Sequence, residues 1–359
     1  MFNIIDSIKD VKSFAINSFD DLLIAEQNLI YCYSNKKIFL NSETILQEIY
    51  SNDNYFYIND IFGKAYYINL NFELVSYDEL ILTIKSNYIL SAKRIGETKN
   101  IYIKNLYDLN ERYEILTSST IYLIDSNKFY KKNFDLNLIE AYMFPSSKKL
   151  WQLELSNLGK FKTEFAGEKE YEVKQFVGVF KDILWVFLNS QQFIGLNIHS
   201  GTIIHLLKGV KKENFIGQTE VPVYDDTYLF YESNYILDDK TGKIIAIAID
   251  LFYEIDLNNE LPTIKSYGLL KQYKNKGFYN QGISNKLILI DNNLYFHNHN
   301  DLKFAIFDID TKQIIYVSEK LTNDQTKRRE IKDLQVANNK VYVLDSTGDL
   351  HIFEKEKLS

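Results

Sequence analysis

Cysteine, proline, tryptophan and glycine are all scarce in this sequence of 359 residues. Cys32 is the only cysteine, so an intramolecular disulfide and a four-cysteine zinc site are both excluded. A single free thiol is typical of a reducing compartment. The 14 glycines form no Walker A loop and no G-x-G-x-x-G fingerprint, and the motifs G-x-S-x-G and H-E-x-x-H do not occur. The sequence therefore lacks the familiar phosphate-binding loops, serine-hydrolase elbows and zinc-protease helices.

Long hydrophobic runs are also missing. No stretch reaches the 18 or so apolar residues that a membrane-spanning helix needs. Residues 1–16 carry Asp6, Lys9 and Asp10 in place of the continuous apolar core of a secretory signal. We therefore expect a cytoplasmic protein.

The charge balance disfavours two classes of partner. The chain has 41 basic and 48 acidic residues, a formal net charge of −7. Proteins that track nucleic-acid phosphates or dock on anionic membranes usually present a basic face. The balance predicts no nucleic-acid partner and no membrane partner, and it is compatible with a basic protein partner.

Residues that favour β-strands are abundant. Aromatic residues make up 15% of the chain, with 27 Tyr and 24 Phe, and only three prolines interrupt it. Short apolar runs such as LIYCYS (29–34) and ILWVFLN (183–189) alternate with Asn, Asp, Ser and Gly turns. Residues 5–24 and 319–333 are the likeliest places for a short helix, and the polar run in the second fits a loop equally well. No linker divides the chain, which predicts one domain over residues 1–359.

One two-strand unit recurs along the chain. Residues 193–207 read FIGLNIHSGTIIHLL, residues 234–248 read NYILDDKTGKIIAIA, and residues 304–318 read FAIFDIDTKQIIYVS. Each contains an apolar strand, a polar turn related to Asp-Thr-Gly, and a second apolar strand. A recurring unit of this kind predicts an all-β propeller of four-stranded antiparallel blades.

The spacing of the turns bears on the number of blades. Gly201 and Gly242 lie 41 residues apart, and the matching Lys312 follows Gly242 by 70. Blades usually recur every ~40–50 residues, so seven blades are favoured, with eight or six as alternatives. The hairpin VYVLDSTGDLHIFEK (341–355), whose turn contains Gly348, is expected to share a blade with N-terminal strands and close the ring.

The repeated hairpins resemble those of a known superfamily. YILDDKTGKIIAI and IGLNIHSGTIIHL are similar to the blade hairpin of the quinoprotein-like (PQQ-like) propellers, and the C-terminal hairpin resembles the other hairpin of such a blade. WD40-like propellers are a weaker match, since no Gly-His and Trp-Asp pair recurs. The resemblance covers about half of the chain and implies the propeller architecture.

The chain departs from that family at functionally important positions. The family's docking tryptophan falls four residues after the turn glycine, where this chain has His205, Ala246 and Tyr316. Several quinone-dependent members use adjacent cysteines, which a chain with Cys32 alone cannot provide. No calcium-ligand set is identifiable. The resemblance therefore implies the fold without the quinone chemistry, and we expect no cofactor.

The histidines give weak metal and catalytic candidates. His297 and His299 form an H-x-H pair whose rings would share one face of a strand and could reach one metal ion. A third ligand is not identifiable, and an exposed strand end explains the pair equally well. His199 and His205 flank a turn, where a polar structural role is favoured over a catalytic one.

Charged pairs and the two tryptophans each have an ordinary structural explanation. Acidic pairs near turns usually cap or solvate them, although a glycosidase or lyase would need two carboxylates across a cleft. Basic groups on loops are usually solvated. Tryptophans in apolar strands usually lie in the core, although they can anchor a partner. The residues concerned are Asp20-Asp21, Asp225-Asp226, Asp238-Asp239, Lys271, Lys274, Lys276, Lys327-Arg328-Arg329, Trp151 and Trp185.

These observations favour a monomeric, non-catalytic propeller that binds a protein partner through its loops. A narrower hypothesis is an immunity protein that neutralises a toxin. Two alternatives stay open: a hydrolase or lyase with its site at the central channel, and a propeller that binds a small ligand or a carbohydrate. The residues that contact the partner are not identified by the sequence.

Overall fold

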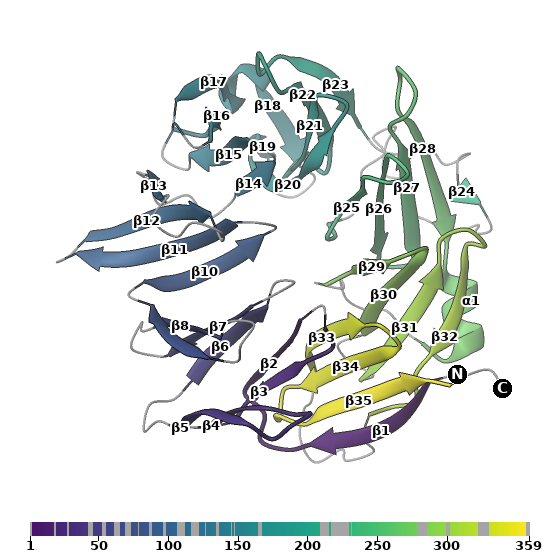
Figure 1. The fold of residues 1–359 in the computed structure, drawn as a ribbon. Helices are drawn as coiled ribbons and strands as arrows, with labels where there is room; N and C mark the ends of the chain where they lie inside the picture. The colour runs from purple at the N-terminus through teal and green to yellow at the C-terminus, as the bar shows by residue number, and fades with distance from the viewer. Residues whose placement is uncertain are drawn as a thin grey trace. The chain divides into compact units, whose positions relative to one another are not determined.

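Antiparallel β-sheets make up most of the described part of the chain in the computed structural model (Figure 1). The structure describes residues 2–17, 19–26, 29–41, 46–51, 55–60, 65–68, 73–77, 79–85, 88–95, 98–105, 112–115, 122–125, 127–133, 136–144, 146, 148–163, 167–208, 215–216, 230, 232–278, 286–298, 302–321 and 330–356. Among these residues, the longest helix has seven residues, and no helix is long and apolar enough to cross a membrane.

Two compact units make up the chain: Met1–Thr117 with Ser318–Ser359, and Ser118–Val317. Among the described residues, each unit contains four larger sheets, numbered here as blades in chain order. Within a blade, consecutive strands pair antiparallel, as the sequence predicted.

Blades 8, 1, 2 and 3 form the first unit. Blade 1 consists of β2 (Ser13–Ile16), β3 (Leu22–Ala25), β4 (Leu29–Cys32) and β5 (Ile38–Asn41). Blade 2 consists of β6 (Leu46–Ser51), β7 (Phe56–Asp60), β8 (Ala65–Ile68) and β9 (Leu74–Tyr77). Blade 3 consists of β10 (Leu80–Lys85), β11 (Tyr88–Ile95), β12 (Thr98–Asn105) and β13 (Arg112–Ile115). Blade 8 consists of β33 (Ile331–Ala337), β34 (Lys340–Asp345), β35 (Leu350–Lys355) and β1 (Phe2–Ile8).

Blades 4 to 7 form the second unit. Blade 4 consists of β14 (Tyr122–Asp125), β15 (Lys128–Asn133), β16 (Leu138–Met143) and β17 (Lys149–Glu154). Blade 5 consists of β20 (Val173–Phe180), β21 (Ile183–Leu188), β22 (Phe193–Asn197) and β23 (Ile203–Leu207). Blade 6 consists of β25 (Ile236–Asp238), β26 (Lys243–Ala248), β27 (Leu251–Asp256) and β28 (Thr263–Gly268). Blade 7 consists of β29 (Ile288–Ile290), β30 (Asn293–Asn298), β31 (Lys303–Asp308) and β32 (Gln313–Val317).

Five further elements described in the second unit lie outside this pattern. A 3-10 helix (Leu155–Leu158) leads into the two-stranded sheet of β18 (Lys160–Thr163) and β19 (Gly167–Glu170). The short β24 (Phe215–Ile216) adds to the edge of blade 6 by pairing parallel with β28. The helix α1 (Leu270–Lys276) contacts β32 of blade 7.

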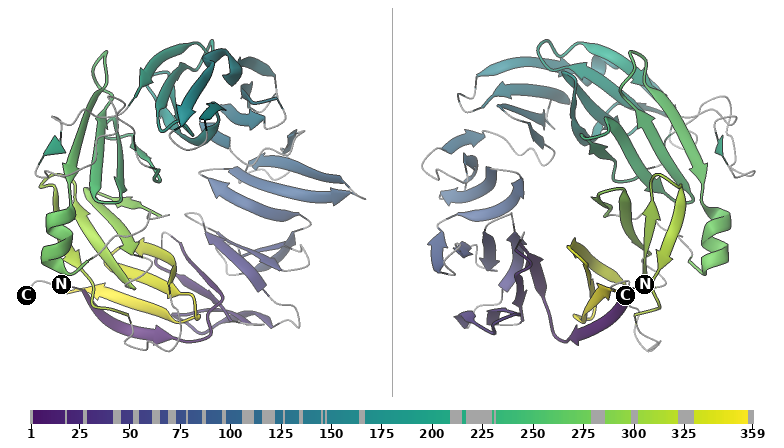
Figure 2. Two further views of the ribbon diagram at one scale, coloured as in Figure 1. Left: turned by 180° about the vertical axis from the view of Figure 1, so that it is seen from behind. Right: turned by 45° about the vertical axis from the view of Figure 1, so that its right-hand side comes forward.

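The predicted joining of the chain ends in one blade is confirmed. β1 pairs with β35 from Phe2 opposite Lys355 to Ile8 opposite Leu350. Figures 1 and 2 show β1, in purple, lying along the yellow β35. The N-terminal strand therefore completes a sheet that begins with the last three strands of the chain.

The favoured number of seven blades is wrong, because the described residues form eight. The three repeated hairpins do not occupy one position in their blades. Residues 193–207 and 304–318 form the last hairpins of blades 5 and 7, whereas residues 234–248 form the first hairpin of blade 6. Matching Gly242 with Gly201 and Lys312 therefore gave unequal spacings and a wrong number of blades.

The two expected helices are also wrong where the structure describes them. Residues 5–24 contribute to β1, β2 and β3, and residues 331–333 begin β33. Residues 322–329 lie outside the described part of the chain. The only α-helix among the described residues, α1, follows blade 6 instead.

The recurring turns are held by side-chain oxygens at their first position. The hydroxyl of Thr241 donates a hydrogen bond to Asp238. In blade 7, both the backbone N–H and the hydroxyl of Thr311 donate to Oδ1 of Asp308, over 2.7 and 2.6 Å. A short carboxylate that accepts local N–H groups stabilises a turn without help from a distant element. This explains why Asp and Thr recur at fixed spacing.

The last residue of each turn adopts a left-handed conformation. The backbone angle φ is +73° at Gly201, +66° at Gly242 and +58° at Lys312. The matching of Lys312 with the two glycines as a turn residue is therefore confirmed. Gly348, with a φ of +92°, meets the same requirement in blade 8.

Within each unit, the apolar core lies between consecutive blades. In blade 5, Leu184 and Val186 face the cluster shared with blade 4, and Trp185 and Phe187 face the cluster shared with blades 6 and 7. Alternate side chains of one strand thus enter two different clusters, because successive residues point to opposite faces. Both faces of a blade must be covered, which explains the continuous apolar runs in the sequence.

The Gly201 turn offers a test of how blades pack. A Cβ atom added at Gly201 would lie 2.6 Å from the Trp151 ring, whereas at Gly167, with a similar φ of +70°, it would meet nothing within 4 Å. We expect Gly201→Ala to lower the free energy of unfolding by about 3 kcal/mol and Gly167→Ala by about 1 kcal/mol. Urea unfolding followed by circular dichroism measures both. Equal losses would contradict the close packing of the indole on the turn.

Candidate functional site

The last strands of blades 4, 5 and 7 share an irregularity that makes their residues comparable. Each of these strands carries one extra residue opposite the third strand of its blade, a β-bulge. The residues directly after the bulge are Trp151 in β17, His205 in β23 and Tyr316 in β32. These three side chains therefore hold the same position in their blades.

Trp151 shows what this position can do. Its indole lies against the turn of the next blade at Gly201, and its Nε1 donates a hydrogen bond of 2.9 Å to the carbonyl of Ile198. The side chain is buried, which confirms the core position predicted from the sequence. Trp151 therefore fills the space between blade 4 and the last turn of blade 5.

The carbonyl that corresponds to Ile198 in blade 6 belongs to Leu257. A repeated backbone hydrogen bond establishes this correspondence. Ile198 donates its N–H to Asp182 in the first turn of blade 5, and Leu257 donates its N–H to Gly242 in the first turn of blade 6. An indole at the position of His205 would therefore approach Leu257.

His205 does not fill the corresponding space between blades 5 and 6, because its ring packs on its own blade. The imidazole stacks on the indole of Trp185, with the ring centroids 5.5 Å apart and the planes 11° from parallel. The residue between them in the sheet is Gly195, where an added Cβ would lie 3.2 Å from each ring. The absence of a side chain at Gly195 therefore allows the two rings to stack.

A groove of about 480 Å³ lies between blade 5 and the last turn of blade 6. Its apolar rim includes Leu261, 75% exposed, and Ile204, 47% exposed. Such exposure of large aliphatic side chains beside a concave surface is typical of an interaction site. The groove is lined by Phe180, Lys181, Ile183, Trp185, Ile204, His205, Leu257, Asn258, Asn259, Glu260, Leu261 and Pro262.

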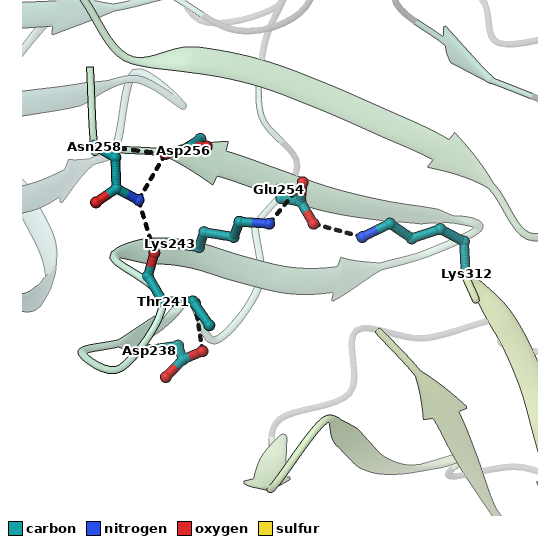
Figure 3. A network of polar contacts seen from close by, with 7 residues as sticks. All are labelled: Asp238, Thr241, Lys243, Glu254, Asp256, Asn258 and Lys312. Carbon is teal, nitrogen blue, oxygen red and sulfur yellow. Dashed lines mark hydrogen bonds and ion pairs between the residues drawn. The ribbon is translucent and has the colours of Figure 1, made fainter. Parts of the chain in front are cut away.

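Polar contacts hold the blade 6 side of the groove in place. The Asn258 side chain donates to the carbonyl of Thr241 and to Asp256, as Figure 3 shows. Lys181 reaches across from blade 5 and donates to the carbonyl of Asn258 over 3.0 Å. The backbone N–H and side-chain amide of Asn258 lower the pKa of Asp256, with help from Lys243. The turn is thus fixed from both blades by an ionised carboxylate and a lysine.

A buried carboxylate joins blade 6 to blade 7 in the same network. Glu254 is 6% exposed and lies 3.3 Å from the ammonium of Lys243. It also pairs with Lys312, which extends from the turn before β32 (Figure 3). Lys312 therefore combines a left-handed backbone with an ion pair to the preceding blade, a role that glycine could not perform.

The other histidine candidates do not form a site among the described residues. His297 is buried in β30 at 3% exposure, and His299 lies outside the described residues, so the proposed H-x-H pair is not described as a site. His199 lies on an exposed turn with its Nε2 3.7 Å from Asp182. Of the histidines singled out in the sequence, His205 lines the groove. Trp185 also lines it but is only 1% exposed, so the favoured prediction of a core position is confirmed for this tryptophan.

The acidic pairs that are described lie at turns. Asp20 and Asp21 lie in a turn in which Asn17 donates to Asp21. Asp238 caps its turn through Thr241, whereas Asp225-Asp226 lie outside the described residues.

The basic group at Lys271, Lys274 and Lys276 is exposed on α1, and Lys327-Arg328-Arg329 lie outside the described residues.

The sequence did not identify the blade 6 side of the groove. Leu261, Pro262 and Asn258 belong to a turn with no Asp-Thr-Gly pattern. The signal that could have pointed to the groove was the missing tryptophan at His205, because that position faces the next blade.

Filling the groove from within tests this account of its origin. We expect His205→Trp to place an indole near Leu257 and to raise the free energy of unfolding by about 1 kcal/mol, as cavity-filling substitutions commonly do. Ile315→Trp, at a 52% exposed residue of β32, is the control for a solvent-facing indole and should give no gain. Denaturant midpoints at unchanged slope report both. A loss of stability in His205→Trp would contradict the proposed vacancy.

Comparison with known proteins identifies the fold. No family model and no curated protein matches the sequence. BamB from Moraxella catarrhalis is similar in structure, with a TM-score of 0.57 and 14% identity over 99% of this chain and 100% of that one. Sqt1 from Saccharomyces cerevisiae gives a TM-score of 0.58 and 12% identity over 99% and 98% of the two chains. The C-terminal WD40 domain of Sif2 gives 0.57 and 11% over 99% of each. The chain has the β-propeller fold, with structural neighbours of both the PQQ-like and the WD40 kinds.

Proposed function

We propose that this propeller binds an extended segment of a partner protein, and that the segment inserts a tryptophan or tyrosine side chain into the groove between blades 5 and 6. The observation that carries this proposal is the contrast between Trp151 and His205. The same strand position holds a docked indole in blade 4 and leaves a groove in blade 5. A partner's aromatic side chain would supply what the chain itself omits.

The edge of blade 5 supports an extended binding partner. β23 is the last strand of its sheet, and among the described residues only β22 pairs with it. Its side chains Ile203, Ile204 and Leu206 are between 39% and 47% exposed. An edge strand with unpaired backbone groups and apolar side chains can accept an added strand.

The neighbouring blade gives a precedent for this mode of binding. The outer edge of blade 6 is paired with β24, a short segment of the chain itself that contains Phe215 and Ile216. The outer edge of one blade in this unit thus accepts a short extended apolar segment. The same mode at β23 requires only that the segment come from another protein.

Charge favours a basic segment. The chain has a net charge of −7, and Glu260 is exposed at the rim of the groove. The rim cation Lys181 donates to the turn at Asn258. A segment with Lys or Arg beside its aromatic residue therefore complements the rim and speeds association.

Selection from a library of random peptides tests the proposed function directly. We expect the enriched peptides to contain Trp or Tyr among β-favouring residues, with Lys or Arg nearby. His205→Trp should weaken their binding at least tenfold, because the indole occupies the groove. Tyr316→Trp, which adds an indole at the same strand position of blade 7, should leave binding within about twofold; a tenfold change is 1.4 kcal/mol.

Affinity purification with the same two variants extends the test to a natural partner. The protein recovered with the unaltered chain and with Tyr316→Trp should be missing with His205→Trp. Recovery that is unchanged by His205→Trp, or peptides without aromatic residues, would contradict binding at this groove.

A further inference from the structure

A second group of polar side chains lies in blade 8, apart from the groove and independent of the function proposed for it. Asp345 ends β34, Asp349 ends the turn that follows, and His351 is the second residue of β35. One ligand atom from each of these three residues lies within 4.8 Å of the other two. The short turn therefore gathers two carboxylates and one imidazole.

Hydrogen bonds from the following turn hold the side chain of Asp345 in place. The residue is fully buried, and its Oδ1 accepts hydrogen bonds from the backbone N–H groups of Thr347 and Asp349 and from the Thr347 hydroxyl. These hydrogen bonds fix the orientation of the carboxylate. The second oxygen, Oδ2, is the one that lies nearest to His351.

His351 presents a nitrogen to this carboxylate without a hydrogen bond. The residue is 5% exposed, and its Nε2 has no hydrogen-bond partner among the residues that the structure describes. Nε2 lies 3.7 Å from Asp345 Oδ2, which is longer than a hydrogen bond. On the other side of the ring, Nδ1 lies 3.5 Å from the hydroxyl of Ser7 on β1. A buried nitrogen that faces a carboxylate without a bond is costly unless something lies between them.

We propose that Asp345, Asp349 and His351 bind one Zn²⁺ ion through Oδ2, a carboxylate oxygen and Nε2. Tetrahedral zinc with ligands at about 2.0–2.2 Å separates its ligand atoms by roughly 3.4 Å, close to the observed 3.7 Å between Nε2 and Oδ2. Asp349, which is partly exposed, offers the third ligand atom within 4.8 Å of the other two. Ser7 then orients the ring from behind, as partners of metal-bound histidines commonly do.

The donor set favours zinc over magnesium. An imidazole nitrogen suits Zn²⁺ and its neighbours in the transition series, whereas Mg²⁺ prefers an all-oxygen set. Two carboxylates and a neutral imidazole balance the charge of a divalent ion. Three protein ligands leave a fourth position for water or for a group from a bound molecule.

The location gives the ion a structural consequence. His351 pairs with Ser7 of β1 on one side and with Val343 of β34 on the other. A bound ion would fix the ring that lies between the N-terminal strand and the C-terminal strands. Binding should therefore stabilise blade 8, the sheet in which the two ends of the chain meet.

Calorimetric titration of the full, chelator-treated chain with ZnCl₂ tests the site. We expect one equivalent of Zn²⁺ to bind, MgCl₂ at the same concentration to give no saturable binding, and Zn²⁺ to raise the unfolding temperature. Asp349→Asn keeps the shape of a partly exposed side chain and removes one charge, so it should weaken Zn²⁺ at least tenfold without unfolding the protein. His351→Gln should weaken it further.

An exposed pair in the same chain provides the matched control. His199 Nε2 also lies 3.7 Å from a carboxylate, that of Asp182, but in an exposed position. His199→Gln should leave the Zn²⁺ affinity within about twofold. The proposal is overturned if the unaltered chain shows no saturable binding, or if Asp349→Asn and His351→Gln bind Zn²⁺ as tightly as the unaltered chain.

Discussion

The structure depends on the burial of apolar side chains between neighbouring blades of each unit. A four-stranded sheet with apolar side chains on both sides has no stable existence alone, so each blade relies on its neighbours within its unit. The strands of blade 5 show this dependence most clearly, since alternate residues of β21 enter two separate clusters. The last strand of a blade is covered less completely. There, a single side chain directed at the next blade determines whether the space between the two blades is filled.

The contrast between Trp151 and His205 follows from that constraint. Trp151 closes its interval by stacking on Gly201 and donating to a backbone carbonyl. His205 stacks on Trp185 within its own sheet, and Gly195 makes that arrangement possible. The groove therefore arises from one residue type at one repeated position. A site made in this way can change its partner by substitution in the turn, while the blades stay intact.

Local features were predictable from the sequence, and long-range ones were not. The Asp-Thr pattern and the left-handed residues Gly201, Gly242 and Lys312 were recognisable because their hydrogen bonds form within a few residues. The position of a hairpin within its blade was not recognisable, because first and last hairpins share the same pattern, and the blade count was wrong for that reason. The groove joins β23 to residues 257–262, and Ser7 of β1 contacts His351 beside the polar group of blade 8. Each of these contacts joins residues that are far apart in the sequence, so the local spacing of residues does not reveal it.

Occupancy of the groove by free indole tests the central claim most directly, because indole is the group that the position of His205 lacks. A crystal of the unaltered protein soaked with indole should show the ring between Trp185 and Leu261, with its N–H directed to the carbonyl of Leu257. The same soak of His205→Trp should show the added side chain in that place and no bound indole. An empty groove in the unaltered protein, or indole bound equally in both crystals, would contradict the account.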